Sequence, residues 1–315
     1  MTKAQKVNHV GVDVCKEKLD VSHPQWPQPR AFSNTAAGLK KLIALLSGGN
    51  VHLVCEPTGG YERLLLKTAH NAEIPISLVN ARQVRDFAKA QGKLAKTDAL
   101  DALVLRQFGE VFAPKPTAPK SALGERLSDI TRLKDHLTRE MAALKNRLEK
   151  NHDRFVKTEL KSLLAIYQRR IEKCALELSK LINSDAELRE KKKRIESITG
   201  LGEGTSTVLI SEMPELGTLS DKEASSLAGV APFNCDSGSK KGQRRIRGGR
   251  SLVRRSLYMP ALSATRFNPI LREFYTGLIA RGKAHHVAIT AVIRKLIRLV
   301  NRLLSDPEFE PQKAA

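Results

Sequence analysis

The sequence predicts a mixed α/β domain followed by a mainly helical remainder. Over roughly the first hundred residues, short apolar runs alternate with segments of helical periodicity. Beyond residue 122, apolar residues recur at spacings of three and four, the pattern of long packed helices. The 315 residues, 41% of them hydrophobic, suffice for two domains with their own cores and a helical connector.

The N-terminal elements follow one another in a definite order. Runs rich in β-branched residues predict strands, and apolar residues spaced along one face predict helices. The expected strands are residues 7–14, 18–23, 30–33, 51–55 and 75–79, and the expected helices are residues 36–46, 60–69 and 81–90. Three strands, then helix, strand, helix, strand and helix, is the order of an RNase H-like sheet, although other α/β folds share pieces of it.

A linker and two long helical stretches come next. FAPKPTAPKSA (112–122) contains three prolines and predicts a linker. The stretches after it predict a coiled coil or a helical hairpin, so we expect packing surfaces there and no site. The expected seam residues are Ile130, Leu133, Leu137, Met141, Leu144 and Leu148, and then Leu160, Leu163, Leu164, Tyr167, Ile171, Leu178 and Leu181. We therefore divide the chain into an N-terminal domain (1–115), a coiled-coil connector (116–192) and a C-terminal domain (193–315).

The chain is strongly basic. It has 54 Lys and Arg against 33 Asp and Glu, a formal net charge of +21 spread along its length. Such a field attracts a polyanion and speeds encounter with nucleic acid. No amphipathic anchor, lipidation motif or long uncharged apolar run occurs, so we expect no membrane partner and a cytoplasmic location. On charge alone, a basic binding protein without catalysis is also consistent.

The four cysteines, Cys15, Cys55, Cys174 and Cys235, lie far apart and form no CxxC pair. The usual zinc spacings are therefore excluded, and a disulfide framework is not indicated. We expect Cys15 and Cys55 to be small buried residues rather than ligands.

Four acidic residues are conspicuous in this basic chain. Asp13 lies within the apolar run HVGVDV, where a lone charge is costly to bury. Glu56 follows the strand VHLVC, and Asp98 and Asp101 share one face of a helix at spacing i, i+3. These carboxylates can converge above a sheet edge, and such hard oxygen ligands suit Mg²⁺ or Mn²⁺. Two ions held there would stabilise the attacking and leaving oxygens of a displacement at phosphorus.

Each acid also has a purely structural interpretation. The helix macrodipole could favour Asp98, Asp101 could be a solvated surface charge, and Glu56 could begin the EPTGG turn. Asp13 is the hardest of the four to explain in this way. Asp20 alternates with the apolar residues of KLDVSH, and we expect it to face solvent.

A segment rich in serine and arginine lies in the C-terminal third. Ser237 and Ser239 occur in CDSGSKKGQRRIRGGR, and a serine hydroxyl can attack a phosphodiester to form a covalent link. Nearby arginines would bind the phosphate and offset its charge, whereas the alternative is a loop that only touches DNA backbone. The eight basic residues expected to bind nucleic acid are Lys240, Lys241, Arg244, Arg245, Arg247, Arg250, Arg254 and Arg255. Upstream, SITGLGEGTSTVLISEM (197–213) is similar to the turn of a helix-hairpin-helix, or is a plain glycine-rich connection.

Together these motifs resemble the DEDD insertion-sequence transposases, a family that includes Piv-type DNA invertases and bridge-RNA-guided recombinases. The N-terminal matches are GVDVCKEKLDV around Asp13, CEPTGGYERLL around Glu56 and KTDALDA around Asp98 and Asp101. The C-terminal matches are SITGLGEGTSTVLISEM and LAGVAPFNCDSGSKKGQRRIRGGRSLVRRSLYMPAL. The resemblance covers nearly the whole chain, in the family's order.

The resemblance implies a RuvC-like N-terminal domain whose four acids bind Mg²⁺, a coiled-coil connector and a helical transposase domain. It implies that Ser237 is the nucleophile, although a register slip of two residues would exchange Ser237 and Ser239. It further implies a homo-oligomer, a dimer or tetramer, in which the acids of one subunit meet the serine of another. Its partners would be double-stranded DNA and a structured noncoding RNA, encoded by the element, that pairs with target and donor DNA.

Three functions follow from these observations. The favoured one is a transposase, a site-specific recombinase that cuts and rejoins DNA through acid-bound metal and a serine nucleophile. The second is a RuvC-like metal nuclease or junction resolvase in which water attacks; the basic C-terminal region with its serine loop counts against it. The third is a nucleic-acid-binding protein without catalysis.

Overall fold

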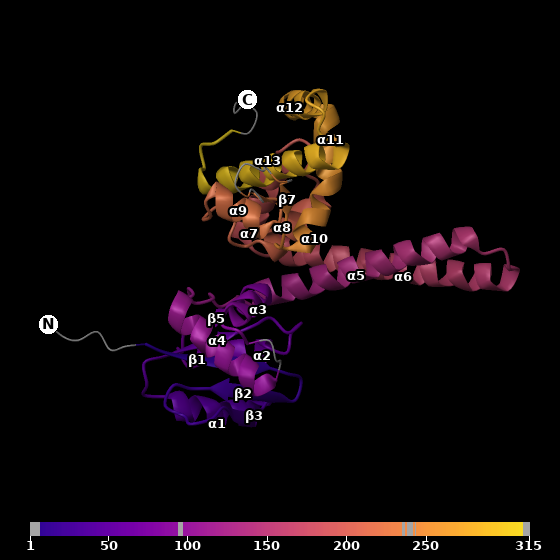
Figure 1. Ribbon diagram of the computed structural model, residues 1–315. Coiled ribbons are helices and arrows are strands. Elements are labelled where there is room, and N and C mark those ends of the chain that lie inside the picture. The colour runs from indigo at the N-terminus through magenta and orange to yellow at the C-terminus, as the bar shows by residue number, and fades with distance from the viewer. Residues whose placement is uncertain (1–6, 94–96, 235–236, 238–241, 243, 311–315) are drawn as a thin grey trace. The chain divides into compact units, whose positions relative to one another are not determined.

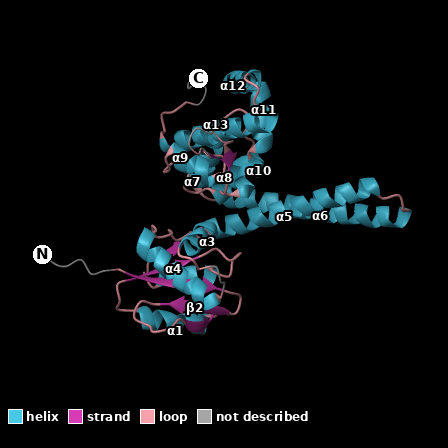
Figure 2. Ribbon diagram, viewed as in Figure 1, coloured by secondary structure: helices cyan, strands magenta, loops and turns pink. Residues whose placement is uncertain are grey.

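The computed structural model describes residues 7–93, 97–234, 237, 242 and 244–310. Internal contacts group the chain into two compact units, Met1–Pro119 and Lys120–Ala315 (Figure 1). The predicted class is confirmed at this level, because a mixed α/β sheet occupies the first unit and helices dominate the second (Figure 2). The finer division at residues 115 and 192 stays a prediction.

The first unit is built on a five-stranded sheet of order β3-β2-β1-β4-β5. The first three strands are antiparallel neighbours, whereas β4 runs parallel to β1 and β5 parallel to β4. Strands 1 and 4 are rich in valine and leucine, as expected for buried central strands. The strands are β1 (Asn8–Val14), β2 (Lys18–Ser22), β3 (Arg30–Ser33), β4 (Val51–Cys55) and β5 (Ile76–Leu78).

Helices cover both faces of this sheet. One face packs with α1 and α2 in a core that contains Val10, Val12 and Leu42. The other face packs with α3 and α4 in a core that contains Val54 and Leu105. The helices are α1 (Ala36–Leu46), α2 (Arg63–Asn71), α3 (Ala81–Ala90) and α4 (Asp98–Phe112). Each expected strand and helix of this region is therefore confirmed, with ends that shift by at most a few residues.

Helix α4 lies directly on β1, and two glycines permit this close approach. A Cβ on Gly11 would lie 2.0 Å from the carbonyl oxygen of Ala102, and one on Gly109 would lie 3.0 Å from Cβ of His9. Because residue 9 faces residue 109 and residue 11 faces residue 102, the helix runs antiparallel to the strand. Its first turn therefore lies over the C-terminal end of β1.

The second unit begins with a helical hairpin of α5 (Ala122–Lys150) and α6 (Arg154–Asn183). The proline-rich linker before it is confirmed, since no helix or strand occupies 113–121. Most of the expected seam residues are wholly or partly buried, but Leu133 and Leu163 are exposed, so these two do not belong to the seam. The base of the hairpin, with Leu127 and Leu178, belongs to the core of the second unit.

The rest of the second unit is a cluster of short helices with one small ribbon. The ribbon pairs β6 (Pro232–Phe233) with β7 (Arg245–Ile246) in antiparallel fashion. The helices are α7 (Ala186–Glu196), α8 (Glu203–Glu212), α9 (Asp221–Leu227), α10 (Ser251–Ser256), α11 (Tyr258–Phe267), α12 (Pro269–Ala280) and α13 (His285–Ser305). Across the described ranges, no helix combines the length and apolarity that a bilayer crossing requires.

Replacing Gly11 with alanine tests the close packing of α4 on β1. The added Cβ would overlap the backbone of α4, which cannot move aside as a flexible side chain would. We expect Gly11→Ala to lower the free energy of unfolding by about 3 kcal/mol. The measurement is urea denaturation of the full chain, with Gly49→Ala as control, because its Cβ would make ordinary contacts at 3.4 Å. Equal stability of the two variants would contradict this packing.

Candidate metal centre and serine segment

Two of the predicted acids come together at the end of β1. Ligand atoms of Asp13, Cys15 and Asp98 all lie within 4.8 Å of one another, and the three side chains are half-buried. Asp13 is near the end of β1, Cys15 is in the turn after it, and Asp98 is the first residue of α4. The cap of α4 fixes this position, since the Thr97 side chain accepts a hydrogen bond from the backbone amide of Leu100.

Glu56 and Asp101 lie at the same edge of the sheet but outside this close group. Val12 pairs with Cys55 in parallel register, so position 56 follows β4 beside position 13 of β1. Alternation along β4 puts position 56 on the face that Val54 shares with α4. Asp101 is in the first turn of α4, and both acids are half-buried. Among the described side chains, neither Glu56 nor Asp101 has a ligand atom within the close group of Asp13, Cys15 and Asp98.

Two polar side chains hold the loops that carry these acids. Glu62 accepts hydrogen bonds from the Thr58 amide at 3.0 Å, the Thr58 hydroxyl at 2.9 Å and the Gly60 amide at 2.8 Å, which orders the loop after Glu56. Burial alone would raise the pKa of Glu62, but these hydrogen bonds hold it below its ordinary value. Asn34 joins the loops, because its amide donates to Cys15 O at 2.9 Å and to Tyr61 O at 3.1 Å.

Asp20 is buried, so the expectation that it faces solvent is wrong. It is 9% exposed and pairs directly with Asp13 across the antiparallel strands β1 and β2. The neighbouring Leu19 points into the opposite core, which leaves Asp20 on the α4 side of the sheet. The reason for the error is that α4 covers this face, and the alternation of residues within β2 carries no information about that cover.

Lys18 forms ion pairs with both Asp20 and Asp98, and Asp98 is one of the predicted metal ligands. Its ammonium lies 2.7 Å from Asp98 Oδ2 and 3.0 Å from Asp20 Oδ2. The second contact is an ion pair without hydrogen-bond geometry, since Asp20 Oδ2 accepts no hydrogen bond within the described part of the chain. The pKa of Lys18 is raised above the ordinary lysine value, first by Asp98 and then by Asp20. This lysine is therefore a cation already placed beside the acids.

The two cysteines near the acids differ. Cys55 is fully buried, as expected, whereas Cys15 is half-buried with its sulfur beside Asp13 and Asp98. Burial, and then the negative charges of these two carboxylates, raise the pKa of the Cys15 thiol. A raised pKa keeps the thiol protonated at neutral pH.

The donor atoms at this edge fit a divalent cation. Asp13 and Asp98 offer hard carboxylate oxygens within 4.8 Å of each other. Asp13 also faces Asp20 across the strands, and like charges directly opposite one another are destabilising. A bound cation relieves this repulsion. In sequence, only the residue type and order of Asp13 and Asp98 indicated the site, while Lys18 and Asp20 gave no comparable signal.

Ser237 follows strand β6 and precedes strand β7, and these two strands pair with each other. In the β6–β7 ribbon, Phe233 pairs with Arg245. Ser237 is exposed. Ser239, Lys240 and Lys241 lie outside the described residues, and their predicted roles stay predictions.

The arginines of this region fall into two groups. Arg244, Arg245 and Arg247 are exposed and make no ion pair with another described residue. The other three make internal contacts, which the sequence did not reveal. Arg250 forms a bidentate pair with Glu215 at 2.6 and 2.7 Å, Arg254 donates to the carbonyls of Gly229 and Gly248, and Arg255 pairs with Asp135 at 2.7 Å.

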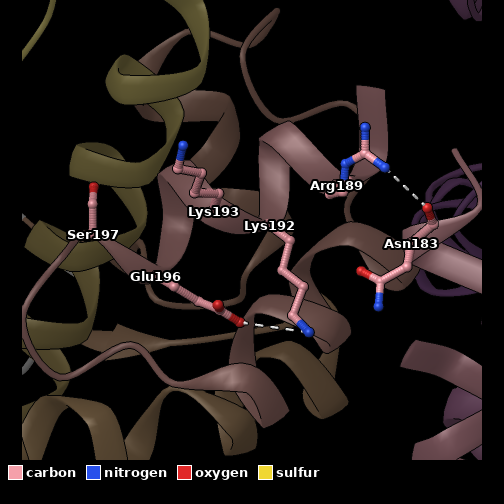
Figure 3. A pocket seen from close by; sticks show the side chains of 6 residues that line it. All are labelled: Asn183, Arg189, Lys192, Lys193, Glu196 and Ser197. Carbon is pink, nitrogen blue, oxygen red and sulfur yellow. Dashed lines mark hydrogen bonds and ion pairs between the residues drawn. The ribbon is translucent and has the colours of Figure 1, made fainter. Parts of the chain in front are cut away.

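The second unit also has a basic recess at the end of α6 and along α7, with a volume of about 420 Å³ (Figure 3). Lys192 is neutralised there by Glu203 at 2.7 Å and faces Glu196 at 4.0 Å. Lys193 is exposed and makes no ion pair with another described side chain. The lining residues are Asn183, Arg189, Lys192, Lys193, Glu196 and Ser197. The recess therefore adds positive surface to the second unit outside the serine segment.

Two family profiles match the chain in the order of its units. One, a DEDD-type profile described as "Transposase", matches residues 10–156, and the other, described as "Transposase IS116/IS110/IS902 family", matches residues 192–276. These two profiles define a transposase, a DNA-binding enzyme of the recombinase class. The chain belongs to the IS110 family of transposases. A DEDD-type domain, with the acid group at β1 and α4, indicates the use of a divalent metal.

Curated relatives agree with this assignment. The chain is 27% identical over 304 residues to the "Pilin gene-inverting protein" of Moraxella bovis, covering 92% of this chain and 94% of that protein. The protein of the same name in Moraxella lacunata gives the same identity and coverage. The "Insertion element IS110 uncharacterized 43.6 kDa protein" of Streptomyces coelicolor is 30% identical over 151 residues, which are 47% of this chain and 36% of that protein.

The two groups of arginines predict two different mutant phenotypes. Arg250→Ala removes a bidentate ion pair and should destabilise the fold by roughly 2 kcal/mol. Arg247→Ala should leave stability within about 0.5 kcal/mol but weaken DNA binding and lower the salt slope of log K by about one. Thermal unfolding and salt-dependent fluorescence anisotropy on one duplex measure both effects. An Arg247→Ala variant that loses stability and keeps full affinity would contradict this division.

Proposed function

We propose that this transposase cuts and rejoins double-stranded DNA with Asp13, Glu56, Asp98 and Asp101 as ligands of Mg²⁺ or Mn²⁺ and with Ser237 as the nucleophile. The observation that carries the proposal is the meeting of Asp13 and Asp98 at one edge of the sheet, where strand and helix contribute one acid each. The order β3-β2-β1-β4-β5, with its antiparallel and parallel halves, supports an RNase H-like sheet of the RuvC type.

The metal would be held by Asp13 and Asp98, with Glu56 and Asp101 beside them, and would stabilise negative charge on the phosphate oxygens. Glu56 and Asp101 would reach it by side-chain rotation, since both lie at the same edge of the sheet. Glu62 and Asn34 would keep the loops in place while these acids bind.

Ser237 would attack the phosphodiester from an exposed position. Its Oγ forms a bond to phosphorus while the bond from phosphorus to the leaving sugar oxygen breaks; the serine proton is lost to solvent, and the sugar oxygen takes one up. The number of phosphoester bonds is unchanged, so the strand can be rejoined without an energy source. Exposed Arg244, Arg245 and Arg247 near the base of the segment would hold the DNA backbone.

We further propose that the chain acts as a homo-oligomer, a dimer or tetramer, with a structured guide RNA encoded by its element. The acids belong to one compact unit and Ser237 to the other, which is consistent with a site shared between subunits. The net charge of +21 supports binding of more than one nucleic acid. The inversion activity in the names of the Moraxella relatives fits recombination by cutting and rejoining.

The covalent step distinguishes this function from its alternatives. With element-end DNA, candidate RNA and Mg²⁺, we expect the wild type to form a protein–DNA adduct that protease digestion removes. Ser237→Ala should lower the adduct by at least about a hundredfold and leave DNA affinity within about twofold. The adduct is quantified by denaturing gel electrophoresis with labelled DNA.

Ser239→Ala is the matched control and should retain the adduct. Asp98→Asn should bind DNA but form no adduct. An undiminished adduct with Ser237→Ala would remove Ser237 from the mechanism, and hydrolysed ends without any adduct would favour the metal nuclease.

A further inference from the structure

The chain carries a cation of its own at the candidate metal centre. Lys18 is the first residue of β2, and the tight turn before it is closed by a hydrogen bond from the Cys15 amide to Lys18 O at 2.9 Å. This turn brings the Lys18 ammonium to 2.7 Å from Asp98 Oδ2, and one carboxylate oxygen of Asp98 lies within 4.8 Å of one of Asp13. The ammonium therefore binds one of the carboxylates that a metal would use.

Asp20 holds Lys18 in this place. The Asp20 side chain is 12% exposed, lies on the α4 side of the sheet and has the Lys18 ammonium 3.0 Å from its Oδ2. Asp20 lies outside the close group of Asp13, Cys15 and Asp98, and its ion pair with Lys18 makes it an anchor for the ammonium. Because Asp13 faces Asp20 across the strands, Lys18 also offsets repulsion between acids in the metal-free chain.

We propose that Lys18 is a built-in competitor for the divalent metal at Asp98, and that Asp20 retains its ammonium when the metal binds. This inference rests on the proposed metal centre. Lys18 is about half exposed, so its four-carbon stem is free to swing from Asp98 toward solvent without disturbing the core. Lys18 thereby lowers the metal affinity of the free protein and keeps the acids ordered until a cation arrives.

The test is Mn²⁺ binding to the full-length protein without DNA, measured by electron paramagnetic resonance of the free ion. Lys18→Met removes the competing charge and should tighten Mn²⁺ binding about tenfold. Lys18→Arg keeps the charge and should stay within about twofold of the wild type. Lys16→Met is the matched control, since it makes the same charge change at an exposed lysine without an ion pair to another described residue.

A second measurement separates competition from a purely structural role. Without metal, Lys18→Met should melt at a lower temperature than Lys16→Met, because Asp13, Asp20 and Asp98 lose their counter-charge. Saturating Mn²⁺ should raise its melting temperature by more than it raises that of the control, as expected for tighter binding.

The outcomes distinguish this inference from the proposed function. If Lys18→Met and Lys16→Met bind Mn²⁺ equally, or if Lys18→Met binds more weakly, the role of Lys18 is overturned and the metal centre remains. If neither the wild type nor Lys18→Met has a saturable site, the metal centre falls and this inference falls with it.

Discussion

The contact of α4 with β1 is the constraint on which the candidate site depends. Asp98 is 85 residues from Asp13 in the chain, and no local interaction can bring them together. Gly11 lets the helix backbone lie against the strand, and the antiparallel course of α4 then places its first turn over the strand's end. The Thr97 cap fixes where that turn begins. The packing at Gly11 thus determines where the carboxylate of Asp98 lies relative to Asp13.

The same packing brings three negative charges close together, and nearby cations offset the repulsion between them. Asp13, Asp20 and Asp98 share one end of a sheet face, and burial of Asp20 removes much of the water that would screen them. Lys18 supplies part of the compensation within the chain. The remaining capacity for positive charge is what an enzyme acting on a phosphodiester requires, because negative charge develops on the phosphate as the bond breaks. In the proposed function, folding and catalysis would therefore both require positive charge at this corner of the molecule.

Sequence reasoning located most of the fold and named the two acids, Asp13 and Asp98, that the structure brings close together. Periodicity identified the strands and helices of the first unit because each buries one face, and residue type singled out Asp13 and Asp98. It failed at Asp20, since alternation tells which residues share a face but not that a distant helix covers that face. Composition also could not reveal that Arg250 pairs with Glu215, because an ion pair between residues far apart in the chain leaves no local pattern in the sequence.

The most direct test of this account is a crystal structure of the protein grown with Mn²⁺, with the ion located by its anomalous scattering. The account predicts an ion bound directly by oxygens of both Asp13 and Asp98, with the Lys18 ammonium moved away from Asp98. An anomalous peak elsewhere in the molecule, with Asp13 and Asp98 pointing apart, would contradict it.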